Sequence, residues 1–83
     1  MSEELLSLLN RVDAAVDAHA ALERVGINPS SFRFSGFGWT VTVIVKLKGS
    51  RKKATPIHAD GDTPDEAVDK LVNGLDIWAK ALA

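Results

Sequence analysis

The stretch from Trp39 to Leu47 constrains the fold of this chain most, because apolar and polar residues alternate along it. A period of two places successive side chains on opposite faces of an extended strand. One face would be apolar, and the other would carry mostly threonine and lysine. The residues assigned to the apolar face are Trp39, Val41, Val43, Val45 and Leu47. The pattern predicts a strand of an antiparallel sheet that has one buried and one wet face.

Two further segments are predicted to be strands of the same sheet. Residues 31–37 alternate, with Phe32 and Phe34 on one face. Residues 53–59 give a weaker alternation that contains Pro56. Because proline lacks the N–H that a central strand donates, this segment is predicted to be an edge strand or a strand with an interrupted ladder.

A long amphipathic helix is predicted from Ser2 to Val25, where apolar residues recur at spacings of three and four. Ser2 is suited to cap its first turn. Gly26 can adopt the left-handed conformation after the last turn, and Pro29 prevents the helix from resuming. These residues predict that the helix ends at Val25.

A second helix is predicted to begin after Thr63. The sequence Thr63-Pro64-Asp65-Glu66 fits a capping box, in which the threonine and glutamate side chains each satisfy a free backbone N–H. An apolar stripe then runs from Val68 to Leu82 and passes through Gly74. This continuity predicts one helix to the end of the stripe.

These elements predict an α+β fold in the order α-β-β-β-α. A helix stripe and a sheet face must each be covered by another element. The simplest arrangement is a three-stranded antiparallel sheet with both helices packed on its apolar face. The length predicts a single domain that spans residues 1–83.

Charge is unevenly distributed in this nearly neutral chain. Ten Lys and Arg residues balance eleven Asp and Glu residues, for a net charge of −1. No cysteine is present, and no apolar run approaches the roughly 18 residues that a membrane span requires. The first residues are acidic, whereas a secretory signal would begin with basic ones. We therefore expect a cytoplasmic protein without membrane contacts.

Few residues suggest catalysis. His19 lies on the apolar side of the first predicted helix, where a partly buried structural role explains it. His58, Asp60 and Asp62 could share one face of an extended chain, but no second cluster completes a set of metal ligands. The acidic residues near Thr63 are explained by the turn and by helix capping. We expect no catalytic residue, no metal, no cofactor and no enzymatic activity.

A basic stretch is the first candidate site. Five of its eight residues are positively charged, and a further arginine lies on the preceding strand. Such a hairpin could bind a phosphate backbone or an acidic protein surface. It could equally be a solvated turn whose lysines discourage strand pairing. The candidate residues are Lys46, Lys48, Arg51, Lys52, Lys53 and Arg33.

The uncovered sheet face is the second candidate site. Ile44, and with it Phe37, would point away from the predicted core beside two threonines. An apolar spot there could be buried in a dimer or against a partner. A single exposed isoleucine is also ordinary. The candidate interface residues are Phe37, Thr40, Thr42 and Ile44.

The element order resembles that of the double-stranded-RNA-binding domain. That resemblance implies a basic cluster that grips phosphates at the start of the last helix. This chain instead has Asp60-Gly61-Asp62-Thr63-Pro64-Asp65-Glu66 there, and its four carboxylates would repel a phosphate. The resemblance therefore supports the fold more than RNA binding.

Two toxin–antitoxin families use variants of this fold. The segment from Asp60 to Ala67 with its following helix resembles the HicB-type antitoxin domain. Pro56-Ile57-His58 is similar to part of the third strand of the HicA-type toxin. The glycine-serine-histidine motif of that toxin is missing, and this chain has Gly36-Phe37-Gly38-Trp39 in its place. A nuclease is not expected.

Two classes of function remain at this stage. We favour a small non-enzymatic interaction or regulatory module of phage-accessory, antitoxin-like or inhibitor type. It would bind a protein partner or form a homodimer. The alternative is a nucleic-acid-binding module that uses the basic hairpin.

Overall fold

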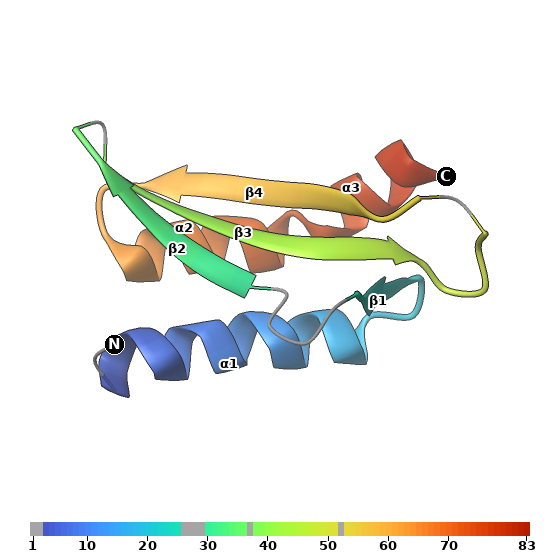
Figure 1. Cartoon of the computed structure of the whole chain (residues 1–83), viewed down its shortest axis with the longest axis horizontal. Coiled ribbons are helices and arrows are strands. Elements are labelled where there is room, and N and C mark those ends of the chain that lie inside the picture. The colour runs from blue at the N-terminus through green and yellow to red at the C-terminus, as the bar shows by residue number, and fades with distance from the viewer. Residues whose placement is uncertain (1–2, 26–29, 37, 52) are drawn as a thin grey trace.

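The computed structural model describes residues 3–25, 30–36, 38–51 and 53–83. They form three helices and a four-stranded antiparallel sheet, which confirms the α+β class (Figure 1). The predicted arrangement of three strands and two helices is wrong by one strand and one helix. The elements are α1 (Glu3–Ala18), β1 (Leu22–Arg24), β2 (Ser30–Ser35), β3 (Gly38–Leu47), β4 (Thr55–Gly61), α2 (Pro64–Asn73) and α3 (Leu75–Leu82).

Strand β3 is the centre of the sheet, and every other strand pairs with it in antiparallel orientation. Val45 pairs with Arg24 of β1 and with Thr55 of β4, so β1 and β4 lie on opposite edges of β3. Val43 pairs in the same way with both β2 and β4. Strands β1 and β2 therefore follow one another along the same edge. The sheet has four strands but is only three strands wide.

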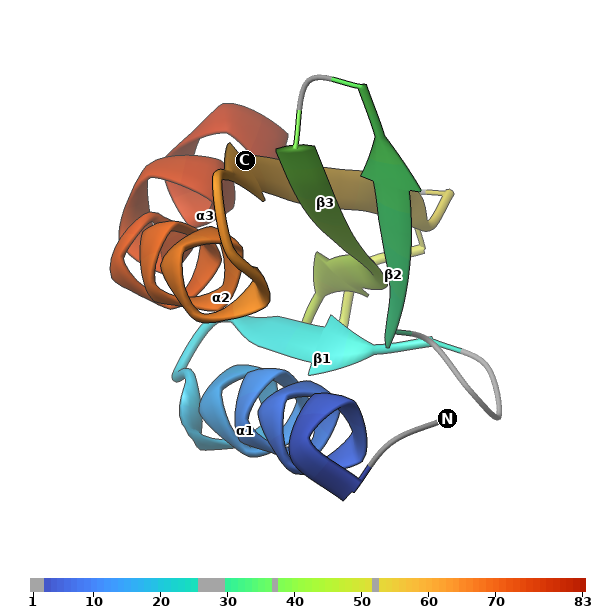
Figure 2. The same cartoon turned by 90° about the vertical axis from the view of Figure 1, so that its left-hand side faces the viewer.

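The apolar face of β3 is the floor of the hydrophobic core. Val41, Val43 and Val45 are 0% exposed, as predicted. The buried residues of α1 and α2 belong to the same core cluster, and both helices lie on this side of the sheet (Figure 2). Burying a valine side chain fully contributes roughly 1.5–3 kcal/mol relative to leaving it in water. This face therefore makes a large contribution to the stability of the domain.

The first helix is shorter than predicted, because residues Leu22–Arg24 form strand β1. Leu22 is fully buried, as its place in the apolar stripe suggested, but it reaches the core from a strand opposite Leu47. A three-residue segment with one buried residue satisfies either period, and pairing with β3 decides between them. The residues predicted to end this helix, Gly26 and Pro29, lie outside the described residues.

The last predicted helix is divided into α2 and α3 at Gly74. The N–H of Gly74 donates to the carbonyls of Lys70 and Leu71 at 3.0 and 3.1 Å, which closes the last turn of α2. The carbonyl of Gly74 then accepts the N–H of Trp78 at 3.0 Å, which begins α3. Glycine has a low helix propensity, and an apolar stripe does not reveal such a break.

The start of α2 agrees with the sequence prediction. Thr63 is the N-cap, and its Oγ1 accepts the N–H of Glu66 at 3.1 Å. The Glu66 side chain accepts the N–H of Asp62 at 3.3 Å, one residue before the N–H of Thr63 that a capping box uses. The strand before it ends at Gly61, which is buried against this first turn. A Cβ at Gly61 would lie 2.6 Å from the backbone nitrogen of Ala67.

Arg24 connects β1 to α1. Its guanidinium makes two hydrogen bonds to Asp17, at 2.8 and 2.7 Å, and lies 3.3 Å from Asp13. The hydrogen bond from Arg24 holds the pKa of the Asp17 carboxyl below its usual value, and the same bond raises the pKa of Arg24. Oδ1 of Asp13 is buried and has no hydrogen-bond partner among the described residues. Arg24 therefore compensates a carboxylate that is partly removed from water.

Gly61→Ala should destabilise the protein by about 1–3 kcal/mol, because the added methyl group would force the α2 backbone away from β4. Gly36→Ala is the matched control, since a Cβ at Gly36 meets nothing within 4 Å. We expect its effect to stay within about 0.5 kcal/mol. Urea unfolding measures both. Equal stability of the two variants would contradict the close packing at Gly61.

Arg24→Gln should lower the urea midpoint at pH 7. Asp17 has a depressed pKa in the folded state, so its contribution is present above its unfolded pKa of about 4. That contribution is lost as the pH falls through the folded value. The difference between variant and wild type should therefore shrink in acid. Arg51→Gln is the control, and a midpoint as low as that of Arg24→Gln would show that Arg24 has no special role.

Candidate interaction surfaces

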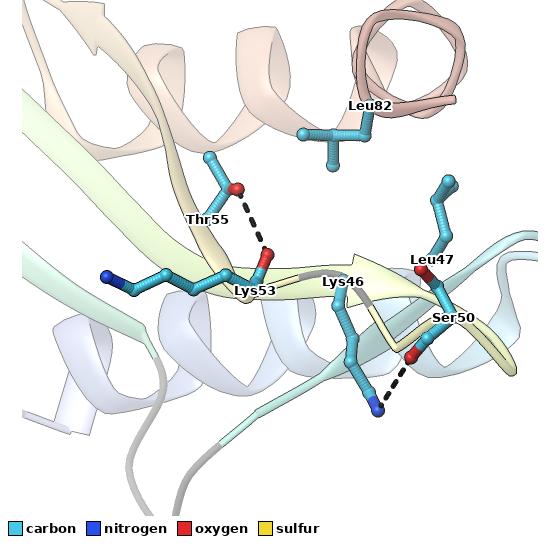
Figure 3. A pocket seen from close by; sticks show the side chains of 6 residues that line it. All are labelled: Lys46, Leu47, Ser50, Lys53, Thr55 and Leu82. Atoms are coloured by element: carbon cyan, nitrogen blue, oxygen red, sulfur yellow. Dashed lines mark hydrogen bonds between the residues drawn. The ribbon is translucent and has the colours of Figure 1, made fainter.

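Two lysines of the predicted basic site make hydrogen bonds and ion pairs within the domain. Nζ of Lys46 lies 3.1 Å from Oε1 of Glu23 and donates to the carbonyl of Ser50 at 3.4 Å (Figure 3). Nζ of Lys48 donates to the carbonyl of His19 at 2.7 Å. That carbonyl lies just past the end of α1, where a cation complements the helix dipole. These two charges are therefore largely committed to intramolecular contacts.

The remaining charges of the basic stretch are displayed at the hairpin between β3 and β4. Arg51 and Lys53 are exposed, and their side chains have no recorded hydrogen bond or ion pair within the described part of the chain. Lys52 lies outside the described residues. The structure thus leaves a smaller free basic site than the sequence suggested.

A small pocket of about 60 Å³ lies beside this hairpin. Its volume is far below that of a typical cofactor site, which is roughly 300–1,000 Å³. The ammonium groups of Lys46 and Lys53 point away from Leu82, which lines the far side (Figure 3). The full set of lining residues is Lys46, Leu47, Ser50, Lys53, Thr55 and Leu82.

Arg33 is not part of the basic hairpin. It is exposed on β2 and pairs in register with Thr40, whereas Lys46 lies near the other end of β3. The six positions from Thr40 to Lys46 correspond to about 20 Å along an extended strand. The sheet therefore separates the two groups of positive charge that the sequence analysis combined.

The predicted open-face interface is mostly polar. Oγ1 of Thr40 donates to Oδ1 of Asp60 at 2.6 Å, and Thr42 pairs in register with His58. Ile44 is 40% exposed and lies opposite Pro56, so the apolar spot is small. Phe37 lies outside the described residues. Binding through this face stays a prediction.

An aromatic cluster on the other face of the β2–β3 hairpin was missed in the sequence analysis. The ring of Trp39 lies 5.0 Å from that of Phe34 and 5.9 Å from that of Phe32, between ring centroids. Phe34 is 67% exposed, and the other two rings are only partly buried. The sequence does contain a signal for this cluster, because four of the five aromatic residues of the chain lie between positions 32 and 39.

These rings are exposed because the helices do not cover the end of the hairpin. The β2–β3 hairpin rises away from α1 and α2 as it approaches its turn (Figures 1 and 2). Alternation placed Trp39 correctly on the apolar side with Val41, and Phe34 lies on the same side because it pairs in register with Trp39. Periodicity gives the side of a strand but not the length over which a helix covers it.

The outer edge of β2 is the least protected edge of the sheet. Among the described strands β2 pairs with β3 alone, and its six residues include neither proline nor lysine and only one charged residue, Arg33. The opposite edge strand, β4, contains Pro56, and the ring of His58 lies 6.3 Å from Trp78 of α3. Strand β1 has three residues. Proline, lysine and short length are the usual ways to prevent edge pairing.

The two histidines, which were considered for catalysis or metal binding, lie in ordinary structural surroundings. Nδ1 of His19 accepts the N–H of Ala21 at 3.1 Å, so Nε2 carries the proton and faces Asp76 at 2.7 Å. His58 is exposed beside Trp78. Within the described ranges, no group of three His, Asp or Glu side chains could hold a metal ion. In the same ranges, no helix is both long and apolar enough to cross a membrane.

Lys48→Met should lower stability by about 0.5–1 kcal/mol, because it removes the cation at the end of α1. Lys53→Met is the control, since it changes an exposed lysine of the same hairpin whose side chain makes no hydrogen bond or ion pair within the described residues. Thermal unfolding followed by circular dichroism compares them. Indistinguishable curves would contradict a structural role for Lys48.

No protein-family model, curated protein or solved structure matches this chain.

Proposed function

We propose that this chain is a non-enzymatic interaction module that binds a protein partner or a second copy of itself. One observation carries the proposal: Phe34 is 67% exposed and packs on Trp39 beside the outer edge of the sheet formed by β2. Aromatic side chains are enriched at protein interfaces, and clusters of them mark binding sites more often than scattered exposed residues do.

The energetics favour a partner that covers this aromatic cluster. Burying a phenylalanine side chain contributes roughly 1.5–3 kcal/mol. The edge of β2 adds backbone N–H and C=O groups that can pair with another strand. Apolar area and directed hydrogen bonds thus lie side by side, as strand addition requires.

The geometry gives less support to catalysis. The pocket of about 60 Å³ is small, and the Thr40–Asp60 and His19–Asp76 pairs satisfy each other. A general acid or base needs access to a substrate proton in a shielded site. His58 is exposed and pairs in register with Thr42, so it does not lie in a shielded site.

The nucleic-acid alternative rests on Arg51 and Lys53, which are exposed and without recorded side-chain contacts. A phosphate-binding surface usually gathers several such charges, and here Arg33 is distant while Lys46 and Lys48 are engaged. The regulatory role and the resemblance to the double-stranded-RNA-binding domain likewise stay predictions.

Site-specific photocrosslinking in the producing cells tests the proposal. A photoreactive phenylalanine analogue replaces Phe34 in one variant and Ile77 in the other. Ile77 is 73% exposed on α3, which makes it a matched apolar control. We expect discrete protein adducts from position 34 and none from position 77, because only position 34 lies in the aromatic cluster.

Two results would contradict this proposal. One is an identical adduct pattern at the two positions. The other is tight, salt-sensitive binding of duplex RNA or DNA that Arg51→Glu with Lys53→Glu abolishes. That second result would transfer the function to the basic hairpin.

A further inference from the structure

We propose that two copies of this chain pair β2 against β2 in antiparallel orientation, about a twofold axis at Arg33. This inference rests on the proposed function and names the partner as a second copy. The result would be one continuous sheet across two subunits, with the aromatic clusters of both on the same side. Closed twofold dimers are the commonest homo-oligomers.

The sequence of β2 is self-complementary. The run Ser31-Phe32-Arg33-Phe34-Ser35 reads the same in both directions. In an antiparallel pair centred on Arg33, each phenylalanine lies opposite a phenylalanine and each serine opposite a serine. Directly opposed side chains share a face of the sheet. The exposed Phe34 of each copy would therefore meet the Phe32 of the other.

This pairing would cover both the outer edge of β2 and the exposed ring of Phe34. It gives a partner strand to residues 31–34 on the outer edge of β2, which no described strand covers, and it covers the Phe34 ring that the helices leave in water. A twofold axis perpendicular to the sheet keeps both helix layers on one side. Trp39, which already packs on Phe34 and Phe32, would flank each new aromatic pair.

Among the described strands, only β2 suits this role. Strand β4 carries Pro56, whose ring nitrogen donates no hydrogen bond, and Trp78 of α3 lies near His58 on it. Strand β1 is only three residues long, and its Arg24 side chain is hydrogen-bonded to Asp17 of α1. Strand β2 has six residues, and none of them is proline.

The same register places Arg33 opposite its counterpart on the open face. Like charges directly opposed across strands are unfavourable. Arg33 has no recorded ion pair in the described structure, so nothing within the subunit neutralises it. Because of this repulsion, the affinity of the wild-type dimer should increase with salt concentration, since salt screens the two guanidinium groups.

A charge-swap experiment tests the axis. Wild type and Arg33→Glu are purified separately, mixed, and analysed by native mass spectrometry and sedimentation. The mixed dimer places Arg33 opposite a glutamate, so it should associate several-fold to about tenfold more tightly than the wild-type dimer. Lys53→Glu makes the same charge change on the other side of the domain. Its mixture with wild type should show no preference for the mixed dimer.

Circular dichroism confirms that each variant is folded, which is expected because Arg33 and Lys53 are exposed. A dimer without preference for the Arg33→Glu mixture would overturn the axis at Arg33. A monomer at all accessible concentrations would overturn self-pairing altogether. If position 34 then still crosslinks to a different protein, the proposed function stands and only the second copy is excluded.

Discussion

The burial of one face of β3 under the two helices of the core is the interaction on which the rest of this structure depends. Val41, Val43 and Val45 are completely buried, and every strand of the sheet pairs with the strand that carries them. Because side chains alternate strictly along a strand, this one constraint also fixes the opposite face, where Thr40, Thr42 and Ile44 point away from the core.

The same constraint explains where the exposed surface lies. The helices cover the middle of β3, but β2 and the start of β3 continue beyond them as a hairpin (Figure 2). Phe34 and Trp39 are on the apolar side of that hairpin, where the Trp39 ring packs against those of Phe34 and Phe32. The aromatic cluster thus extends the core pattern past the area that the described helices cover. A second subunit or a partner would complete it.

Part of this fold could be predicted from the sequence because local signals and tertiary packing agree there. The alternation of β3, the edge position of the strand with Pro56 and the capping residue Thr63 are examples. Strand β1 was missed because Leu22 fits a helical stripe as well as a strand, and only its pairing with Leu47 separates the two. The division at Gly74 was missed because an apolar stripe continues across a broken helix.

The candidate sites show a similar division. Charge along the sequence identified a basic hairpin, but it could not show that Lys48 contacts the end of α1 or that Arg33 lies far away along the sheet. Those facts depend on register, which spacing alone does not give. The aromatic cluster depends on how far the helices extend over the sheet, which is a property of the assembled layers.

Amide hydrogen exchange measured by NMR at low and high protein concentration tests whether the buried face of β3 holds the fold together. We expect β3 amides to exchange slowest at both concentrations, because their opening requires loss of the core. We also expect amides of β2 to gain protection at high concentration while those of β4 do not change. Fast exchange of β3 amides would contradict the role of the buried β3 face. Exchange of β2 amides at a rate independent of protein concentration would contradict the pairing of β2 between two copies.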